Sequence, residues 1–138
     1  MGRCLTPQEA PATRRFMIEL TQEFGFDAAH RLGLGSAQNA QLHGHSFYAE
    51  VTLRGAPDPA TGWLRDLGEV KAVLETVRGN LDHRLLNEVD GLGIPTLENL
   101  ARFIFASVKR ELPETVRVRV RRPSFGQSCV YDESERGG

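Results

Sequence analysis

The sequence predicts an α+β domain in which two helices cover one face of a four-stranded antiparallel sheet. Its 138 residues are enough for a single domain with a substantial core. Segments with the two-residue period of a strand occur in pairs near both ends of the chain, and two segments with helical spacing lie between them. Such an order is typical of domains whose helices gather on one face of an antiparallel sheet.

The first pair of strands is predicted at residues 16–26 and 46–54, where apolar and polar side chains alternate. Residues 32–41 between them are rich in Gly, Ser, Ala and Asn, which indicates a loop. Residues 55–62 contain two prolines and two glycines, and these residue types indicate a turn. The two strands can therefore pair as a hairpin across residues 32–41.

Both helices are predicted in the middle of the chain. Residues 67–77 carry apolar side chains at helical spacing, and we expect Gly79 and Asn80 to end this helix. A second helix is predicted at residues 96–110, with Thr96 as its N-cap.

The last two strands are predicted near the C-terminus. Val116, Val118 and Val120 alternate with arginines, as in a strand with one buried and one polar face. Residues 128–131 are predicted as a short final strand.

Composition excludes several classes of protein. The net charge of -1 gives no excess of basic residues for a nucleic-acid partner, and no run of eighteen apolar residues exists to cross a membrane. Cys4 and Cys129 lie in unlike contexts, which argues against a disulfide and favours a reducing, cytoplasmic location. Residues 1–15 are expected to be a flexible lead without a signal-peptide core, residues 16–133 the single domain, and residues 134–138 a tail.

The histidines carry the first functional signal. The chain has four of them, and His43 and His45 are separated by one glycine, so that on a strand both rings point to the same face. His30 closes the first predicted strand and would lie beside them in a hairpin. Three neutral imidazoles suit a tetrahedral zinc site with one open position. The spacing alone leaves a second interpretation open, in which these are ordinary polar residues at strand ends.

Five segments, in order, resemble the signature of a known family. They read FDAAHR at residues 26–31, LHGHSF at 42–47, DLGEVK at 66–71, LDHRLLN at 81–87 and PTLENLA at 95–101. In the 6-pyruvoyltetrahydropterin synthase and 6-carboxytetrahydropterin synthase family, similar segments occur in the same order. The resemblance covers roughly residues 16–132, and five ordered motifs are far more specific than one.

This resemblance implies a T-fold subunit that assembles into trimers or hexamers with active sites between subunits. It implies a zinc-dependent lyase that acts on 7,8-dihydroneopterin triphosphate, with His30, His43 and His45 as metal ligands. Zinc in such a site is a Lewis acid that acidifies a bound hydroxyl. Asp82 and His83 are implied in proton transfer, although adjacent residues are expected to point apart.

The substrate residues implied by the resemblance are Thr96, Glu98 and the residue at position 122. Glu98 has an equally good interpretation as a first-turn charge that faces the helix dipole. The family usually has a Glu-Thr pair after its penultimate strand, where the glutamate anchors the pterin, and this chain has Arg122 and Pro123 there. Arginine offers only donors and favours a carboxylate or a phosphate.

A second departure concerns the general base. The family usually has a cysteine a few residues before the His-Gly-His triplet, and residues 31–42 contain none. Asn39 lies at about that place, and an amide cannot take up a proton near neutral pH. Cys129 is expected to be a buried structural thiol, and Cys4 a bystander.

Three hypotheses follow from these departures. The first is a zinc-dependent lyase of this family that acts on a related reduced pterin or another anionic, polyol-bearing substrate. A non-catalytic paralog that keeps the zinc and the fold as a ligand-binding or assembly protein is the alternative. In a third, the chain makes the standard product slowly, with His83 alone as the base.

Overall fold

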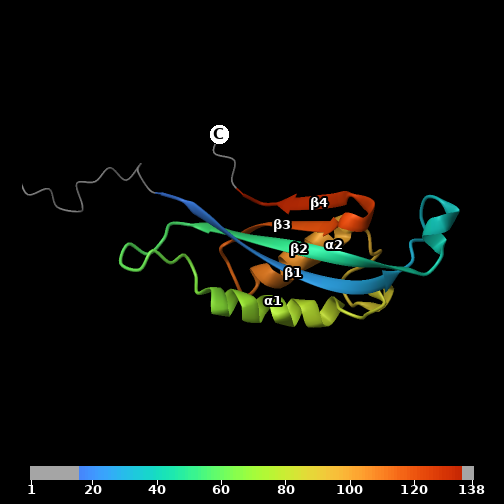
Figure 1. The fold of residues 1–138 in the computed structure, drawn as a ribbon, viewed down its shortest axis with the longest axis horizontal. Coiled ribbons are helices and arrows are strands. Elements are labelled where there is room, and N and C mark those ends of the chain that lie inside the picture. The colour runs from blue at the N-terminus through green and yellow to red at the C-terminus, as the bar shows by residue number, and fades with distance from the viewer. Residues whose placement is uncertain (1–15, 135–138) are drawn as a thin grey trace, which may run out of the picture.

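A computed structural model describes residues 16–134 of the chain. Four strands form one antiparallel sheet in the order β1-β2-β3-β4, and helices α1 and α2 pack together on one of its faces (Figure 1). The strands are β1 (Ile18–His30), β2 (His43–Gly55), β3 (Thr115–Arg122) and β4 (Gln127–Asp132). The helices are α1 (Leu67–Leu81) and α2 (Leu97–Lys109), with short 3-10 turns at Ala37–Ala40, Leu86–Glu88 and Pro123–Phe125.

The long hairpin of β1 and β2 organises the sheet. Its register pairs Ile18 with Gly55 at one end and His30 with His43 at the other. Because side chains alternate along each strand, this register puts one set of apolar residues from both strands on the helix side. The connection at residues 31–42 projects beyond the sheet (Figure 1), where Leu32 donates its amide hydrogen to the Asn39 carbonyl.

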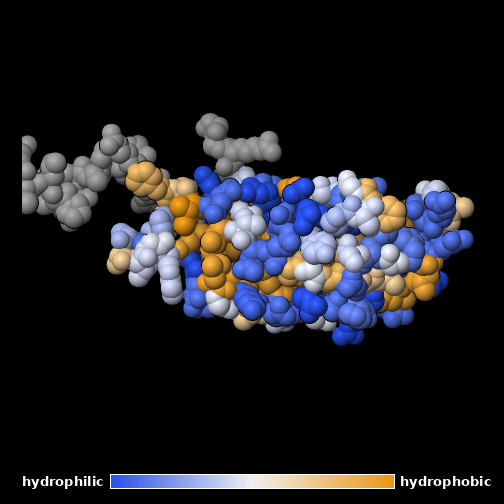
Figure 2. Space-filling model, viewed as in Figure 1, coloured by the Kyte–Doolittle hydropathy of each residue, from blue (hydrophilic) through white to orange (hydrophobic). Residues whose placement is uncertain are grey.

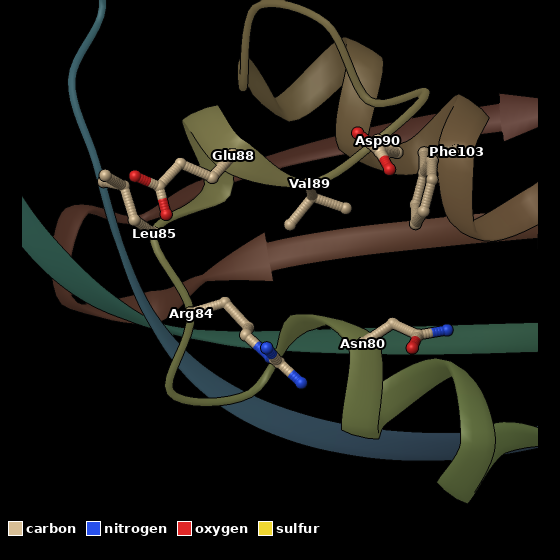
Figure 3. A pocket seen from close by; sticks show the side chains of 7 residues that line it. All are labelled: Asn80, Arg84, Leu85, Glu88, Val89, Asp90 and Phe103. Carbon is tan, nitrogen blue, oxygen red and sulfur yellow. The ribbon is translucent and has the colours of Figure 1, made fainter.

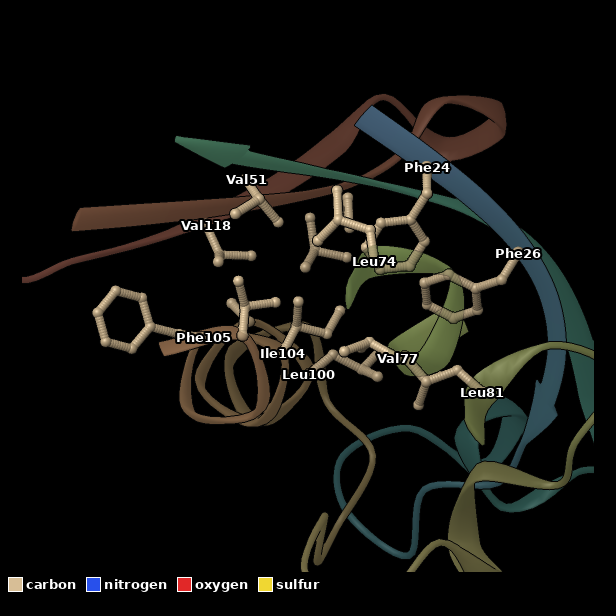
Figure 4. Close-up of a cluster of buried hydrophobic side chains, with 14 of the residues drawn as sticks. Phe24, Phe26, Val51, Leu74, Val77, Leu81, Leu100, Ile104, Phe105 and Val118 are labelled. Carbon is tan, nitrogen blue, oxygen red and sulfur yellow. The ribbon is translucent and has the colours of Figure 1, made fainter. Parts of the chain in front are cut away.

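The hydrophobic core fills the space between the sheet and the two helices. Side chains from all these layers point toward one another in Figure 4. Phe47 and Val51 of β2 are fully buried, as are Leu100 and Ile104 of α2. Thr96 caps α2 by accepting from the Asn99 amide, as predicted.

Helix α1 runs further than the sequence predicts. The expected stop at Gly79 and Asn80 is wrong, because the helix continues to Leu81. Leu81 is fully buried, so its burial in the core offsets the low helix propensity of the glycine. Asp82 then ends the helix in an extended conformation.

The segment after α1 runs along the outer edge of β1. The Ala29 amide donates to the Arg84 carbonyl, and Leu85 forms a parallel bridge with Ala29. The His83 amide donates to the Asp27 carbonyl at 2.7 Å. These bonds cover the edge of β1 at its C-terminal end, next to the histidines.

The face of the sheet opposite the helices is polar and internally ion-paired. Arg117 of β3 binds Glu19, Arg119 binds Glu50, and Arg121 binds Glu23. In Figure 2, hydrophilic residues dominate the visible surface, and hydrophobic residues show mainly in the seam between the sheet and α1. The arginines that alternate with the valines of β3 therefore find carboxylates on β1 and β2.

The predicted α+β class and the four-stranded sheet with two helices on one face are confirmed. Within residues 16–134, no helix is long and apolar enough to cross a bilayer. The predictions for residues 1–15 and 135–138, and for Cys4, lie outside the described residues.

Candidate metal centre

Three histidine rings meet at the end of the β1–β2 hairpin. His30 pairs in register with His43, and Ala28 with His45, so that all three rings lie at one end of the sheet. One ring nitrogen from each lies within 4.8 Å of the other two. The predicted convergence of His30, His43 and His45 is therefore confirmed, while their role as ligands is a proposal. Phe47 packs against the rings of His30 and His45, with ring centroids 6.0 and 5.5 Å away.

Backbone carbonyls fix the orientation of two of the rings. His30 Nδ1 lies 2.9 Å from the Pro95 carbonyl oxygen, and His43 Nδ1 lies 2.8 Å from that of Gln41. A carbonyl only accepts, so both Nδ1 atoms carry the hydrogen and donate it. In the neutral rings, Nε2 then presents a lone pair. Such carbonyl contacts are the usual outer partners of metal-binding histidines.

The two lone pairs face each other. His30 Nε2 and His43 Nε2 are only 3.0 Å apart, and neither neutral ring has a second hydrogen to share between them. Such a contact is repulsive unless a proton or a metal ion lies between the two nitrogens. Two nitrogens bound to one tetrahedral zinc at about 2.05 Å would be about 3.3 Å apart, close to this separation. The residues present thus fit a zinc-type metal ion.

Burial keeps two of the three rings neutral. His30 and His45 are 1% and 9% exposed. Burial, and secondly the charge of Arg122, lowers the pKa of His45 to about 4. Burial likewise lowers the pKa of His30, partly opposed by the Pro95 carbonyl. Both rings are therefore unprotonated at neutral pH, which is the form that binds a metal.

His45 is the ring whose polar atoms are least satisfied. Its Nδ1 is buried and has no hydrogen-bond partner within the described chain. Arg122 Nη1 lies 3.3 Å from its Nε2, and the ring of Phe125 packs edge-on against it with centroids 5.0 Å apart. The turn after β3 brings both residues here, because Gly126 takes the left-handed conformation (φ 64°) that reverses the chain.

A cavity of about 500 Å³ opens beside His43 and His45. Arg122 and Phe125 line one side, and Asn39 lines the loop side. No acidic residue is among its described lining residues, which also include Leu32, Gln38, Gln41 and Gln127. Its size is typical of small-molecule sites.

The chain matches the 6-pyruvoyl tetrahydropterin synthase family profile over residues 19–134. It belongs to this family. A 6-pyruvoyl tetrahydrobiopterin synthase of Pongo abelii is 30% identical over 138 aligned positions, which cover 88% of this chain and 95% of the relative. The dihydroneopterin monophosphate aldolase of Pyrococcus furiosus is 35% identical over 94 residues, or 68% of this chain and 77% of that protein.

Solved structures support the family assignment. The 6-pyruvoyl tetrahydropterin synthase of Caenorhabditis elegans superposes with a TM-score of 0.76 at 27% identity, covering 88% of this chain and 99% of that one. A Plasmodium vivax 6-pyruvoyltetrahydropterin synthase with a substituted catalytic residue has a TM-score of 0.67. At 19% identity, it supports the fold alone. Since the named relatives are pterin synthases and an aldolase, this chain stands among the enzymes of the family.

In this family member, Asp82 and His83 lie apart from the cavity beside the three histidines. His83 instead lines a second cavity of about 580 Å³, together with Asp27 and Ser46, whose side chains lie on the open face of the sheet. His45 is a lining residue of both cavities. The expectation that the two neighbours point apart is wrong. His83 has a positive φ of 58°, which turns its Nδ1 back to within 2.9 Å of Asp82 Oδ2.

Asp82 is held as a carboxylate. The Asp27 amide donates to its Oδ1 at 3.0 Å, and Arg78 lies 3.2 Å from its Oδ2. The amide of Asp27 and then the His83 ring lower the pKa of the Asp82 carboxyl. Asp82 thus orients His83, whose side chain is 80% exposed.

The other predicted site residues have mixed positions. Asn39 lines the cavity, but its side chain donates to the Leu34 carbonyl and so holds the loop together. Thr96 is the helix N-cap. The charge of the Glu98 carboxylate acts to raise the pKa values of both Arg122 and Cys129, so Glu98 lies close enough to affect the β3–β4 end of the sheet. Cys129 is half-buried rather than buried, and burial raises the pKa of its thiol.

Sequence reasoning missed four groups at this centre. They are the carbonyls of Pro95 and Gln41 and the side chains of Phe125 and Gln127. Every residue has a backbone carbonyl, so the residue type does not show which carbonyl orients a ring. Phe125 and Gln127 flank Gly126 in the turn between β3 and β4, and only their spacing after β3 could have indicated them.

Figure 3 shows a third cavity, of about 450 Å³, whose described lining residues include no histidine. Arg84, Glu88 and Asp90 supply its charged groups, and Phe103 of α2 supplies an aromatic wall. None of His30, His43 and His45 is among its described lining residues.

The Asp82 contacts predict a pH-dependent stability. Folding lowers the pKa of this carboxyl, so its contribution is complete above the unfolded pKa of about 3.9 and is lost as the pH falls through the lower, folded value. Urea unfolding of wild type and Asp82→Asn should therefore show a difference at pH 7 that shrinks as the pH is lowered below about 3.9. A difference that persists undiminished at pH 3 would show that the carboxylate charge is not responsible.

Proposed function

We propose that this chain is a zinc-dependent lyase of the 6-pyruvoyl/6-carboxytetrahydropterin synthase type. The observation that carries the proposal is the pair of Nε2 atoms of His30 and His43, which lie 3.0 Å apart on rings that backbone carbonyls orient. His45 completes the proposed set of three ligands, and His43 and His45 line a cavity of small-molecule size. Bound zinc would polarise the substrate's side-chain oxygens.

The proposed substrate is 7,8-dihydroneopterin triphosphate or a related reduced pterin or anionic polyol. The named activities of the relatives support a pterin, and the Pyrococcus furiosus aldolase supports a phosphorylated one. Arg122 supports an anionic group. Since none of the lining residues found within 16–134 is acidic, these residues do not supply the usual acceptor for the amidine edge of a pterin.

Proton transfer is proposed for Asp82 and His83. The carboxylate of Asp82 holds His83 at Nδ1, which leaves Nε2 of the exposed ring free to exchange a proton. Since His83 lines a different cavity of the same chain, we propose that it acts in a site completed by a second copy. Thr96 and Glu98 are proposed to border the substrate from the start of α2.

One observation favours the alternative of a non-catalytic, zinc-containing binding protein. Of the described residues that line the cavity beside the histidines, none is a cysteine or a carboxylate that could act as a base. In that case the protein would bind a pterin-like ligand without turning it over.

The metal proposal predicts about one equivalent of zinc per chain. Elemental analysis of zinc-reloaded and desalted protein should give this value for wild type and for His83→Ala, the control from the second cavity. His43→Ala should retain less than about a tenth, because removal of one ligand of three weakens such a site strongly. Full retention of zinc by His43→Ala would contradict the proposed ligand set.

The departures predict slow turnover of 7,8-dihydroneopterin triphosphate. The absence of a general base typically costs about 10²–10⁴ in rate. Chromatography of products from zinc-loaded wild type should therefore show far less product than a typical family member, and His83→Ala should abolish it.

An Asn39→Cys, Arg122→Glu double variant tests the cause. It should gain activity if these two positions account for the loss, although Asn39→Cys also removes the bond to the Leu34 carbonyl. Ordinary enzyme rates in wild type would refute this account of the departures. Trace turnover that His83→Ala leaves unchanged would favour the binding-protein alternative.

We also propose a homo-oligomer, a trimer or a hexamer. β1 and β4 are the two edges of the sheet, and only the C-terminal end of β1 is covered by residues 83–85. Edges with unpaired backbone groups favour pairing with another chain. Sedimentation at micromolar concentration should give at least three times the subunit mass of 15.3 kDa. A mass of one subunit throughout this range would exclude the ring.

A further inference from the structure

Arg122 is held in place beside the three histidines. Its Nε donates to Gln127 Oε1 at 2.7 Å, across the β3–β4 pair in which the two residues are opposite each other. Its guanidinium carbon lies 5.8 Å from the ring centre of Phe125. Its Nη1 lies 3.3 Å from His45 Nε2. Three contacts therefore fix one end of a five-donor group at the wall of the cavity.

No carboxylate of residues 16–134 forms an ion pair with Arg122, whereas five of the ten other arginines there have one. Five arginines of the described chain have a carboxylate oxygen within 4.0 Å: Arg65, Arg78, Arg117, Arg119 and Arg121. Burial lowers the pKa of Arg122, and the charge of Glu98 opposes this shift. A half-buried, unpaired guanidinium favours an anion as its partner.

A metal ion and the present contact of Arg122 cannot both use His45. If the metal binds Nε2, it takes the lone pair to which Arg122 donates. If it binds the buried, unpartnered Nδ1, the ring hydrogen moves to Nε2 and faces the Nη1 donor. In either case the metal-bound state leaves donors of Arg122 without an acceptor, next to a second positive charge.

We infer that Arg122 binds an oxyanion group of the substrate, a carboxylate or a phosphate, and that this anion and the metal strengthen each other's binding. The anion supplies the acceptor that Arg122 loses when His45 binds the metal, and it reduces the repulsion between guanidinium and metal. The inference rests on the proposed function in one respect, that the three histidines bind a metal. It goes further by naming the group that selects the substrate.

Thermodynamic linkage makes the effect reciprocal. An anion that raises the affinity for the metal by some factor is itself bound more tightly by the same factor when the metal is present. Couplings of this kind typically amount to about 5–150-fold. Without an anion, Arg122 should weaken metal binding, because two positive groups would lie close together in a half-buried site.

The test measures zinc affinity by competition with a chromophoric chelator, at constant ionic strength, in chloride, acetate or methyl phosphate. Chelator-only titrations in each salt correct for zinc bound by the free anion. The variants are Arg122→Gln, which removes the charge, and Arg122→Lys, which keeps the charge but loses the planar guanidinium that can donate two parallel hydrogen bonds. Arg119→Gln, on the same strand but facing the opposite side, is the matched control.

For wild type and Arg119→Gln, we expect acetate or methyl phosphate to tighten zinc binding at least about 5-fold. Whichever anion gives the larger effect identifies carboxylate or phosphate as the group. Arg122→Gln should bind zinc more tightly than wild type in chloride, by about 10-fold, and should respond to neither anion. Arg122→Lys should stay weak in chloride and respond less to the anions.

Two failures are distinguishable. Zinc that binds wild type equally in all three salts, with no change in Arg122→Gln, would overturn the inference and leave the metal centre intact. A wild-type protein that binds no zinc in any salt would contradict the proposed function, and the inference with it. Circular dichroism and sedimentation of each variant establish that the fold is unchanged.

Discussion

The register between β1 and β2 is the constraint on which the rest of this structure depends. It pairs His30 with His43 and puts the rings of both, with that of His45, at one end of the sheet. A slip of one residue would move His43, His45 and Phe47 together to the open face, away from His30. The same register aligns the apolar faces of both strands with α1 and α2, so the forces that stabilise the core also assemble the centre.

Unfavourable contacts between polar atoms indicate that the centre binds a ligand. Two lone pairs face each other at 3.0 Å, and His45 Nδ1 is buried without a partner. Natural cores satisfy nearly all their buried polar atoms, so exceptions indicate a missing ligand or a functional site. Arg122 adds an unpaired positive charge to the same wall. A cation among the imidazoles, with an oxyanion at Arg122, would satisfy all of these groups together.

Much of the fold and of this centre was predictable from the sequence, for local reasons. Alternating residues located β1, β2 and β3, and the His-Gly-His triplet showed that two rings share a face. The end of α1 was not predictable, since the burial of Leu81 outweighs the preference of Gly79. Nor was the contact between Asp82 and His83, because it depends on a left-handed backbone at a non-glycine residue. The two carbonyls that orient the rings were not predictable either. Pro95 lies far from His30 in sequence, and the Gln41 carbonyl acts through the backbone, which the residue type does not reveal.

Anomalous diffraction at the zinc edge, from crystals of the zinc-loaded protein, tests the central claim most directly. The account predicts one strong peak per chain at the end of the hairpin, about 2.0–2.1 Å from one ring nitrogen each of His30, His43 and His45. The absence of a peak there, or an ion whose ligands leave out His30, would contradict it.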